Sequence, residues 1–408
     1  SATTGNIAKD GSDTTIEIGS DLTASGELEF DHGSGKVIFT AGSEGEKVIN
    51  TGDVVFENKV NANIVVGKDV TFNIADNNND FAVYYGNNLD LYGTIKGGQN
   101  YGSLYLYQGD HTIHAEGTLA TGRLHSRYDS VTVLGAEGET RRYAEDVAVA
   151  DRTDAQVNIN FLFQESGTFA AKDTFVNVGA ANGGDGHGIY DSNKGSVRDT
   201  NAPVFNFANT KLNAYQIQLQ RGETTFGADG SVITITAEFN TNGTVNLTNT
   251  KLTVGKALTN TGSFSFDLAS TITVGGLVNS STITVDMTGA SSDLALLIDY
   301  TGNGVMTLAD YGSVTLSNAN YSTMVINNDL YAVSKSLDLT DVAVNAAWAG
   351  TEIGKEVAAG EFFGLNAFDT TDNLSGLPAM KTLSITDTTA GGALDLTKFD
   401  SLAMTVVN

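Results

Sequence analysis

A motif repeats at a fixed interval in the second half of the sequence. The stretch FNTNGTVNL begins at Phe239, LTNTGSFSF begins at Leu258 and LVNSSTITV begins at Leu277, so successive copies lie 19 residues apart. In each copy the last four residues alternate between polar and apolar side chains, which is the pattern of a strand with one buried face. The Asn and Gly residues before each strand favour a turn, because both types tolerate left-handed backbone.

This interval constrains the fold. A second alternating segment lies between the copies, at Lys251–Lys256 and again at Ser270–Gly276, so each interval holds at least two short strands and two turns. One such repeat cannot bury its apolar face alone, and successive repeats must stack to build a continuous core. The sequence therefore predicts an all-β fold, a right-handed parallel β-helix (β-solenoid), because parallel crossovers are right-handed.

The stacking has a specific consequence for the repeated residues. We expect Val245, Phe264 and Ile283, which occupy the same place in the three copies, to lie above one another in adjacent coils. The alternative fold is an antiparallel β-sandwich, whose strands recur about every 8–12 residues. A sandwich does not require the copies to keep one register, so the fixed interval favours the solenoid.

The pattern also divides the chain. Weaker versions of it run from the N-terminus, and the sequence predicts a β-solenoid over residues 1–290. Residues 138–156 are charged and Ala-rich, and residues 179–203 are rich in Gly, Asn and Asp, so both are predicted to be loop insertions, which often carry binding functions. After residue 290 the pattern changes, and we expect a small C-terminal antiparallel β cap or assembly domain over residues 291–408, with a hairpin that turns at NND.

Composition excludes several classes of partner. The 22 Lys and Arg residues face 48 Asp and Glu residues, for a formal charge of −26, which disfavours nucleic acid and anionic membrane surfaces. The chain has no Cys, so disulfides and thiol chemistry are excluded. It lacks a run of about 18 apolar residues that would span a bilayer as a helix. The sequence begins SATTG, as expected for a mature chain after removal of a signal peptide or for a shortened chain, and we expect an extracellular or bacterial cell-surface location.

One loop has the spacing of a calcium site. In DYTGNGVMTLAD, Asp299, Thr301, Asn303 and Asp310 occupy the ligand positions of a calcium-binding loop, and a Gly allows its sharp turn. These four residues are candidate Ca²⁺ ligands. The alternative is a plain turn between strands, because Thr and Asn replace carboxylates and the last ligand is Asp rather than Glu. No other cofactor is indicated.

Tyrosines gather in one region. Tyr105 and Tyr107 alternate with Leu104 and Leu106, so the two tyrosines share one face of a predicted strand. Aromatic platforms of this kind bind sugars, which makes Tyr105 and Tyr107 candidate ligand-binding residues. The alternatives are a protein–protein contact and ordinary ring stacking along a solenoid face.

Basic residues form a short strip in GRLHSRYDS. If this segment is a strand, Arg123, His125 and Arg127 share one face. Parallel β-helix polysaccharide lyases use a basic residue as general base, so the strip is a candidate for catalysis. The alternative is an exposed or ion-paired strip on an acidic protein, and no other catalytic motif is present.

The corner repeats of Glu238–Met287 resemble the passenger regions of bacterial autotransporter adhesins and other large, repetitive bacterial surface proteins. The resemblance implies a right-handed parallel β-helix, surface exposure, and adhesion or scaffolding, and it supplies no catalytic residues. The alternating lipid-facing strands of the outer-membrane barrel that such proteins carry are not recognised here.

Three functions are therefore expected, in this order. The first is a structural one, a subunit that assembles with itself, head-to-tail or laterally, into an extracellular filament, sheath or surface layer. The second is an adhesin that binds a glycan or a host matrix through its loops. The third is a polysaccharide lyase that uses the Arg123–Tyr128 strip.

Overall fold

The structure is a computed structural model that describes residues 7–334, with gaps, and two short strands near the C-terminus. The gaps are 10–12, 25, 33–34, 58–61, 76–77, 85, 98–101, 137–154, 180–186, 192–200, 293 and 327, and beyond residue 334 the description is limited to 383–385 and 404–406. The chain divides into unit 1 (Ser1–Asn246) and unit 2 (Leu247–Asn408). The two units are described in turn.

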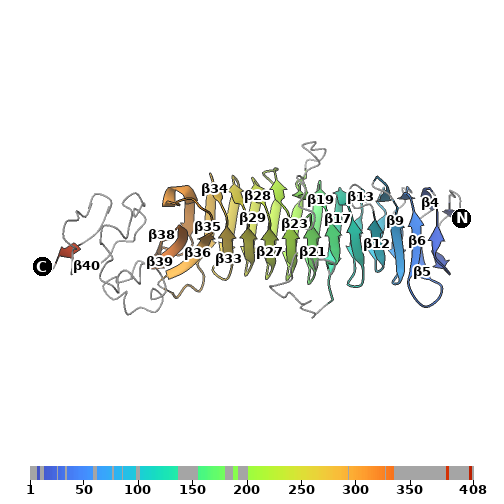
Figure 1. Cartoon of the computed structure of the whole chain (residues 1–408), viewed down its shortest axis with the longest axis horizontal. Coiled ribbons are helices and arrows are strands. Elements are labelled where there is room, and N and C mark those ends of the chain that lie inside the picture. The colour runs from blue at the N-terminus through green and yellow to red at the C-terminus, as the bar shows by residue number, and fades with distance from the viewer. Residues whose placement is uncertain are drawn as a thin grey trace. The chain divides into compact units, whose positions relative to one another are not determined.

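Unit 1 is built from coils that each contribute one strand to three sheets (Figure 1). Sheet 1 contains β1 (Ile7–Lys9), β4 (Leu28–His32), β7 (Val54–Phe56), β10 (Asp80–Val83), β13 (Ser103–Tyr107), β16 (Arg123–Arg127), β19 (Phe161–Gln164), β22 (Gly188–Tyr190), β25 (Ile217–Leu219) and β28 (Glu238–Thr241). Sheet 2 contains β2 (Thr14–Ile18), β5 (Lys36–Ala41), β8 (Asn63–Val66), β11 (Asn88–Leu91), β14 (Asp110–Ile113), β17 (Asp129–Leu134), β20 (Gly167–Lys172), β23 (Val204–Ala208) and β26 (Thr225–Asp229). Sheet 3 contains β3 (Leu22–Thr23), β6 (Lys47–Thr51), β9 (Val70–Ile74), β12 (Thr94–Gly97), β15 (Thr118–Thr121), β18 (Val157–Ile159), β21 (Phe175–Val178), β24 (Lys211–Ala214) and β27 (Val232–Ile235).

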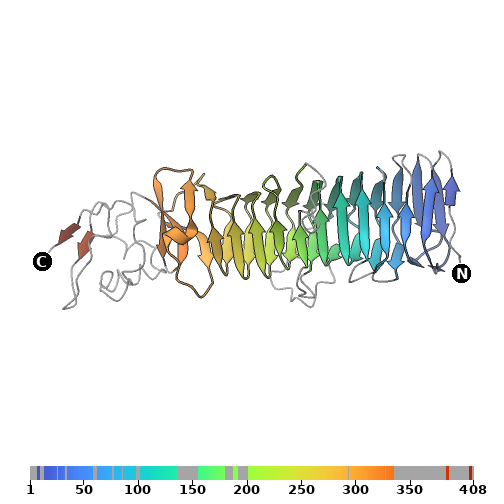
Figure 2. The same cartoon turned by 90° about the horizontal axis from the view of Figure 1, so that it is seen from above.

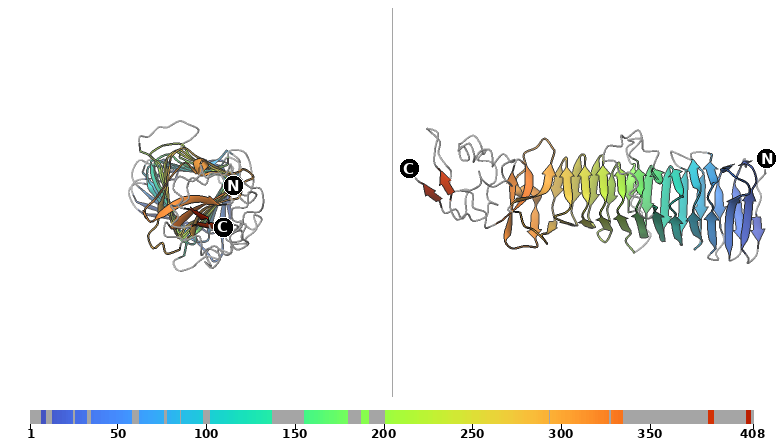
Figure 3. Two further views of the ribbon diagram at one scale, coloured as in Figure 1. Left: turned by 90° about the vertical axis from the view of Figure 1, so that its left-hand side faces the viewer. Right: turned by 90° about the horizontal axis from the view of Figure 1, so that it is seen from below.

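Within each of these sheets the neighbouring strands come from successive coils and pair in parallel. Typical pairings are β10 with β13 in sheet 1, β8 with β11 in sheet 2 and β9 with β12 in sheet 3. Figures 2 and 3 show the same stacking of unit 1 strands from further sides. The chain therefore winds through the three sheets in turn, as a β-solenoid requires.

Alternation of side chains decides which face of each strand is buried. In β8, Ile64 and Val66 are fully buried, whereas Asn63 and Val65 are partly exposed on the outer face. The period of two places every second side chain in the core between the sheets. Burial of that apolar row is the main stabilising contribution of each coil.

Phenylalanine rings fill the core of the first coils. Phe56 stacks on Phe30 of the preceding coil, with ring centroids 4.7 Å apart, and Phe72 meets Phe39 and Phe81 edge-on at 5.1 and 5.2 Å. These rings come from all three sheets and are at most 4% exposed. They join neighbouring coils into one hydrophobic core.

The corners between sheets use residues that accept left-handed backbone. Gly167, at the start of β20, has a φ of 76°, and a Cβ atom there would lie 1.9 Å from the carbonyl oxygen of Asp129 in the coil below. Asn209 has a φ of 44° at the corner before β24. Both positions combine a conformation that most residues avoid with close contact between coils.

Unit 2 contains coils of the same kind, including the second and third copies of the 19-residue repeat. Leu258 pairs with Leu277, and Phe264 pairs with Ile283, so these repeat positions lie one above the other. The strands are β30 (Lys251–Val254), β31 (Ala257–Asn260), β32 (Ser263–Asp267), β33 (Thr271–Val274), β34 (Leu277–Asn279) and β35 (Thr282–Asp286). Strand β29 (Thr244–Thr248) crosses the boundary between the two units.

The end of unit 2 changes from parallel to antiparallel pairing. Strand β36 (Leu294–Tyr300) is parallel to β33 but antiparallel to β39 (Asp329–Ser334), which also pairs with β38 (Tyr321–Ile326) in a hairpin. Strand β37 (Ser313–Leu316) is parallel to β35 and follows a 3-10 helix, η2 (Leu308–Tyr311). The predicted hairpin at NND is confirmed, and Asn328 in its turn has a φ of 72°.

The fold is thus all-β, a parallel β-solenoid with a small antiparallel region toward the C-terminus, as the sequence predicts. Two details differ. Parallel pairing continues past the expected boundary at residue 290, through β36 and β37. The sequence predicts at least two strands in each 19-residue interval, and the structure adds a third short strand that contains Phe239, Leu258 or Leu277. Most of the predicted cap beyond residue 334 lies outside the described residues, although β40 (Leu383–Ile385) and β41 (Met404–Val406) pair there.

Candidate ligand-binding face

Tyr105 and Tyr107 lie on the outer face of β13. Leu104 and Leu106 alternate with them and are buried in the core, so the two tyrosines share one face, as their spacing predicts. The ring of Tyr105 lies 5.5 Å from that of Tyr84 in the preceding coil. Their proposed role in ligand binding remains a prediction.

Strand β16 places the basic strip directly beside these tyrosines. Tyr105 pairs with His125 and Tyr107 pairs with Arg127 across the parallel ladder. The rings of Tyr105 and His125 meet edge-on with centroids 4.8 Å apart. Arg123, His125 and Arg127 do share one face, as expected for a strand, and that face carries the two tyrosines as well.

A carboxylate from the next coil organises the strip. Glu165, which follows β19, has one oxygen 2.8 Å from Nε2 of His125 and the other 3.0 Å from Nε of Arg127. The Arg127 contact is an ion pair rather than an aligned hydrogen bond, because its Nε–H makes no hydrogen bond there. The Glu165 side chain is only 7% exposed. Because Glu165 is shielded from water, its contacts fix the positions of the His125 and Arg127 side chains.

Arg123 is held differently, by aromatic rings. Its guanidinium carbon lies 5.6 Å from the centroid of Phe161 and 5.5 Å from that of Phe163, both on β19. Phe161 and Phe163 are stacked on each other at 5.7 Å. These distances are those of cation–π contacts, which orient a guanidinium without neutralising it.

The row of side chains continues along sheet 1. Phe163 pairs with Tyr190 of β22, which in turn pairs with Gln218 of β25, and the rings of Phe163 and Tyr190 stack at 5.2 Å. Gln216 donates a hydrogen bond of 2.8 Å to the hydroxyl oxygen of Tyr190, and Gln218 donates one of 3.1 Å to Gln216. The aromatic–arginine face comprises Tyr105, Tyr107, Arg123, His125, Arg127, Phe161, Phe163 and Tyr190, with the glutamines at one end.

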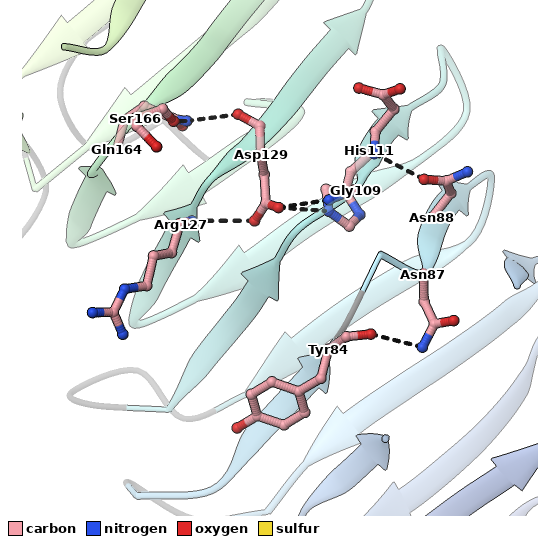
Figure 4. Close-up of polar contacts among 10 residues, drawn as sticks. Tyr84, Asn87, Asn88, Gly109, His111, Arg127, Asp129, Gln164 and Ser166 are labelled. Atoms are coloured by element: carbon pink, nitrogen blue, oxygen red, sulfur yellow. Dashed lines mark hydrogen bonds and ion pairs between the residues drawn. The ribbon is translucent and has the colours of Figure 1, made fainter. Parts of the chain in front are cut away.

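Asp129, at the corner between β16 of sheet 1 and β17 of sheet 2, makes hydrogen bonds that hold the end of β16 in place (Figure 4). Buried Asp129 accepts hydrogen bonds from the backbone N–H groups of Gly109, at 2.7 Å, and Arg127, at 3.1 Å. Its backbone carbonyl accepts a hydrogen bond from the side chain of Gln164, and Nε2 of buried His111 lies 3.9 Å from its carboxylate. Asp129 thus ties three coils together where β16 ends.

Tyr128 occupies this corner in an unusual conformation. Its φ of 63° lies in the left-handed region, which a bulky residue rarely adopts. The ring meets Tyr107 edge-on at 5.5 Å, and the guanidinium carbon of Arg127 lies 5.7 Å from the Tyr128 centroid. Backbone strain of this kind concentrates at functional sites, and the strained corner places the Tyr128 ring against two residues of the face.

The buried Asp129 makes the stability of the coil dependent on pH. Burial raises the pKa of its carboxyl, while His111 and the two backbone N–H groups oppose that rise. A raised folded-state pKa means that the stabilising contribution is complete below the unfolded-state pKa of about 3.9 and is lost as pH rises through the folded-state value. The unmodified protein should therefore lose part of its unfolding free energy as pH rises above about 3.9, and we expect Asp129→Asn to reduce that loss, measured by urea titration.

Asp229→Asn is the matched control for this variant, because Asp229 is an exposed aspartate at the end of β26. It should leave the pH dependence as it is in the unmodified chain. Identical pH profiles for Asp129→Asn and the unmodified chain would show that the buried carboxyl does not titrate in this range.

The face is equipped for binding. Both carboxylate oxygens of Glu165 are occupied by His125 and Arg127 and almost no surface of that side chain is accessible, so Glu165 is poorly placed to exchange a proton with a ligand. Among the residues that the structure describes, no group of three or more His, Cys, Asp and Glu side chains could hold a metal ion. Partly exposed rings, a guanidinium and amides are groups that contact a ligand without reacting with it.

The predicted calcium loop lies in unit 2, and its side chains have protein partners. The carboxylate of Asp310 accepts hydrogen bonds from the backbone N–H and the hydroxyl of Thr307, at 2.8 and 2.7 Å, and so caps η2. Asp299 accepts a hydrogen bond of 3.2 Å from Thr273, and the hydroxyl of Thr301 donates to the carbonyl of Val274. Asn303 lies in the exposed bend between β36 and η2. Calcium binding by these residues remains a prediction.

Both predicted insertions lie largely outside the described residues. Residues 137–154 fall between β17 and β18, and residues 180–186 and 192–200 flank β22. In sequence, they lengthen the coils that carry the aromatic–arginine face. Paired residues Tyr105 and His125 are 20 positions apart, whereas His125 and Phe163 are 38 positions apart.

Sequence reasoning did not find Phe161, Phe163, Glu165 or Tyr190. A signal for the first three was present: FLFQESG alternates in the same way as LYLYQG at Leu104–Gly109. Nothing in either segment shows that β19 pairs with β16, because the intervening insertion hides the register.

These features define a class of protein, an all-β chain with parallel β-solenoid coils and an aromatic–arginine face on one sheet. No family model, curated protein or solved structure matches the chain. In the described part of the chain, no helix has both the length and the apolar character needed to cross a membrane.

Proposed function

We propose that this protein is a surface-exposed bacterial β-solenoid that binds glycan through the aromatic–arginine face. The observation that carries this proposal is a row of aromatic side chains on sheet 1, in which Tyr105, Phe163 and Tyr190 lie in register on strands β13, β19 and β22. The rings of Tyr105 and Tyr190 are partly exposed, whereas Phe163 is only 5% exposed. Phe161, which lies beside Phe163 on the same face of β19, is partly exposed as well. Large apolar groups gathered on an outer face are typical of interaction sites.

The chemistry of the face suits a saccharide. Aromatic rings provide flat apolar surfaces for the C–H faces of sugar rings, and neighbouring amides and guanidinium groups provide hydrogen bonds for hydroxyl groups. Gln216 and Gln218 supply such amides beside Tyr190. Parallel strands spaced about 4.8 Å apart repeat these contacts along one direction, which favours an extended ligand over a single small molecule.

The support is rigid, which lowers the entropic cost of binding. His125 and Arg127 are fixed by Glu165, and the corner below them is fixed by Asp129. A preorganised site loses little side-chain freedom when the ligand arrives. An extracellular or cell-surface location is part of the proposal, since that is where a polysaccharide ligand is encountered. Assembly into a filament, sheath or surface layer stays a prediction.

A binding experiment with tyrosine variants tests the proposal. The unmodified protein should bind at least one polysaccharide on an immobilised glycan panel, and Tyr105→Ala/Tyr107→Ala should weaken that binding by about tenfold or more, because aromatic anchors contribute more than about 1 kcal/mol each at binding sites. Tyr92→Ala is the matched control, since Tyr92 stacks on His114 away from this face.

Two results would contradict the proposal. One is the absence of binding to every glycan on the panel by a protein whose circular dichroism shows folded β structure. The other is equal binding by the tyrosine double variant and the Tyr92→Ala control. Release of unsaturated sugars from a bound polysaccharide would instead support the lyase alternative.

A further inference from the structure

Positive charge is concentrated in one part of an otherwise acidic chain. All seven arginines lie between residues 123 and 221. This stretch holds 12 Asp and Glu residues against 10 Lys and Arg residues, whereas the whole chain has a formal charge of −26. Strands β16, β19, β22 and β25, which build most of the aromatic–arginine face, belong to this nearly neutral stretch. The stretch of sequence that contributes these strands is therefore nearly neutral, unlike the chain as a whole.

Within the face, Glu165 is matched by its two basic neighbours. It lies within 3.0 Å of His125 and Arg127, and Arg221 donates a hydrogen bond of 2.7 Å to its backbone carbonyl. His187 packs edge-on against Phe161, and burial lowers the pKa of its ring, which disfavours a further positive charge beside Arg123. The one carboxylate among these residues is thus already paired.

Arg123 carries a charge that the face does not neutralise. Among the described residues, no carboxylate lies within 4.0 Å of its guanidinium, and its buried Nε makes no hydrogen bond. Asp80, two coils away in the same row, is the acidic group that Arg123 influences at longer range. The guanidinium rests on Phe161 and Phe163, which hold it in place without pairing its charge.

We infer that the ligand of this face is a carboxylate-bearing polysaccharide, a polymer that contains uronic acid residues, and that Arg123 selects it. This inference rests on the proposed glycan-binding function. A planar guanidinium with parallel N–H donors matches a carboxylate in a bidentate contact. The neighbouring aromatic rings contact the sugars. The group that recognises the carboxylate and the groups that recognise the sugar rings therefore lie on adjacent strands.

Paired ligands that differ only in charge test this inference. The probes are polygalacturonate, alginate and hyaluronan, each compared with its esterified form, which keeps the sugar backbone and removes the carboxylate charge. The unmodified protein should bind at least one acidic polymer about tenfold or more tightly than its ester, since hydrogen bonds to charged groups contribute about 1.5–3 kcal/mol. Added salt should weaken the acidic interaction more than the ester interaction.

Arg123→Gln keeps polar donors near the rings but removes the charge. It should reduce binding of the acidic polymer to the level of the ester, with little change in binding of the ester itself. Lys211→Gln is the matched control, because Lys211 is also a cation stacked on a ring, 5.1 Å from the centroid of Phe175, but on sheet 3. It should leave both affinities unchanged.

The outcomes separate the two proposals. Equal binding of every acidic polymer and its ester would overturn the inference about charge and leave glycan binding in place. Preference for the acidic polymer that persists in Arg123→Gln would assign selectivity to another group and overturn the role of Arg123. Failure to bind any glycan, acidic or neutral, would overturn the proposed function together with this inference.

Discussion

Phe72→Ala is expected to lower the free energy of unfolding by about 3–5 kcal/mol, the range for deletion of a buried aromatic side chain. Phe72 is fully buried and touches rings from two neighbouring strands, Phe39 and Phe81, at 5.1 and 5.2 Å. Parallel coils cannot collapse into the resulting cavity without breaking their backbone ladders, so little of the loss is recovered. Urea-induced unfolding followed by circular dichroism measures the change.

Phe161→Ala provides a control with the same chemical change on the outer face. Phe161 is partly exposed and supports Arg123 rather than the core. Its loss should reduce stability by much less than the Phe72 substitution while weakening glycan binding. Equal destabilisation by the two variants would contradict the assignment of inner and outer faces in these coils.

Glu165→Ala is expected to destabilise the protein by up to about 3–5 kcal/mol, because removing one member of a buried ion pair leaves the others without compensation. His125 and Arg127, whose side chains are 8% and 14% exposed, would lose their shared carboxylate. The effect should be smaller when Arg127 is also removed, since the double variant leaves less uncompensated charge. A cycle of Glu165→Ala, Arg127→Ala and the double variant gives the coupling free energy.

Glu238→Ala is the control for the ion cluster. Glu238 belongs to the same sheet, at the start of β28, and its side chain is partly exposed beside Asn240. Its removal should change stability by less than about 0.5 kcal/mol, as is usual for surface substitutions. A coupling free energy near zero between Glu165 and Arg127 would show that the cluster does not hold the face together.

The fold was largely predictable from the sequence because its determinants are local. Alternation gives the strands, and a fixed interval gives the coil, as the pairing of Phe264 with Ile283 illustrates. The third strand of each coil was missed because its segments are only three or four residues long, and Asn and Thr in them also favour turns. Their strand character comes from pairing with neighbouring coils, which is a tertiary effect.

The candidate site was predictable only in part. The shared faces of Tyr105 with Tyr107, and of Arg123 with Arg127, follow from period two. Their union on one surface depends on the register between β13 and β16, and the contribution of Glu165 depends on the register across an insertion. Register between coils of unequal length is fixed by three-dimensional pairing and leaves no mark in a single sequence.

The unequal lengths of these coils have a consequence for how such a protein changes over time. The ladder between β16 and β19 keeps its register although 38 residues, rather than 20, separate its partners. Extra residues enter at a corner and leave the backbone pairing of both strands intact. Segments at those corners can therefore be lengthened, shortened or exchanged without refolding the molecule, and laboratory grafting of foreign peptides between β17 and β18 should be tolerated for the same reason.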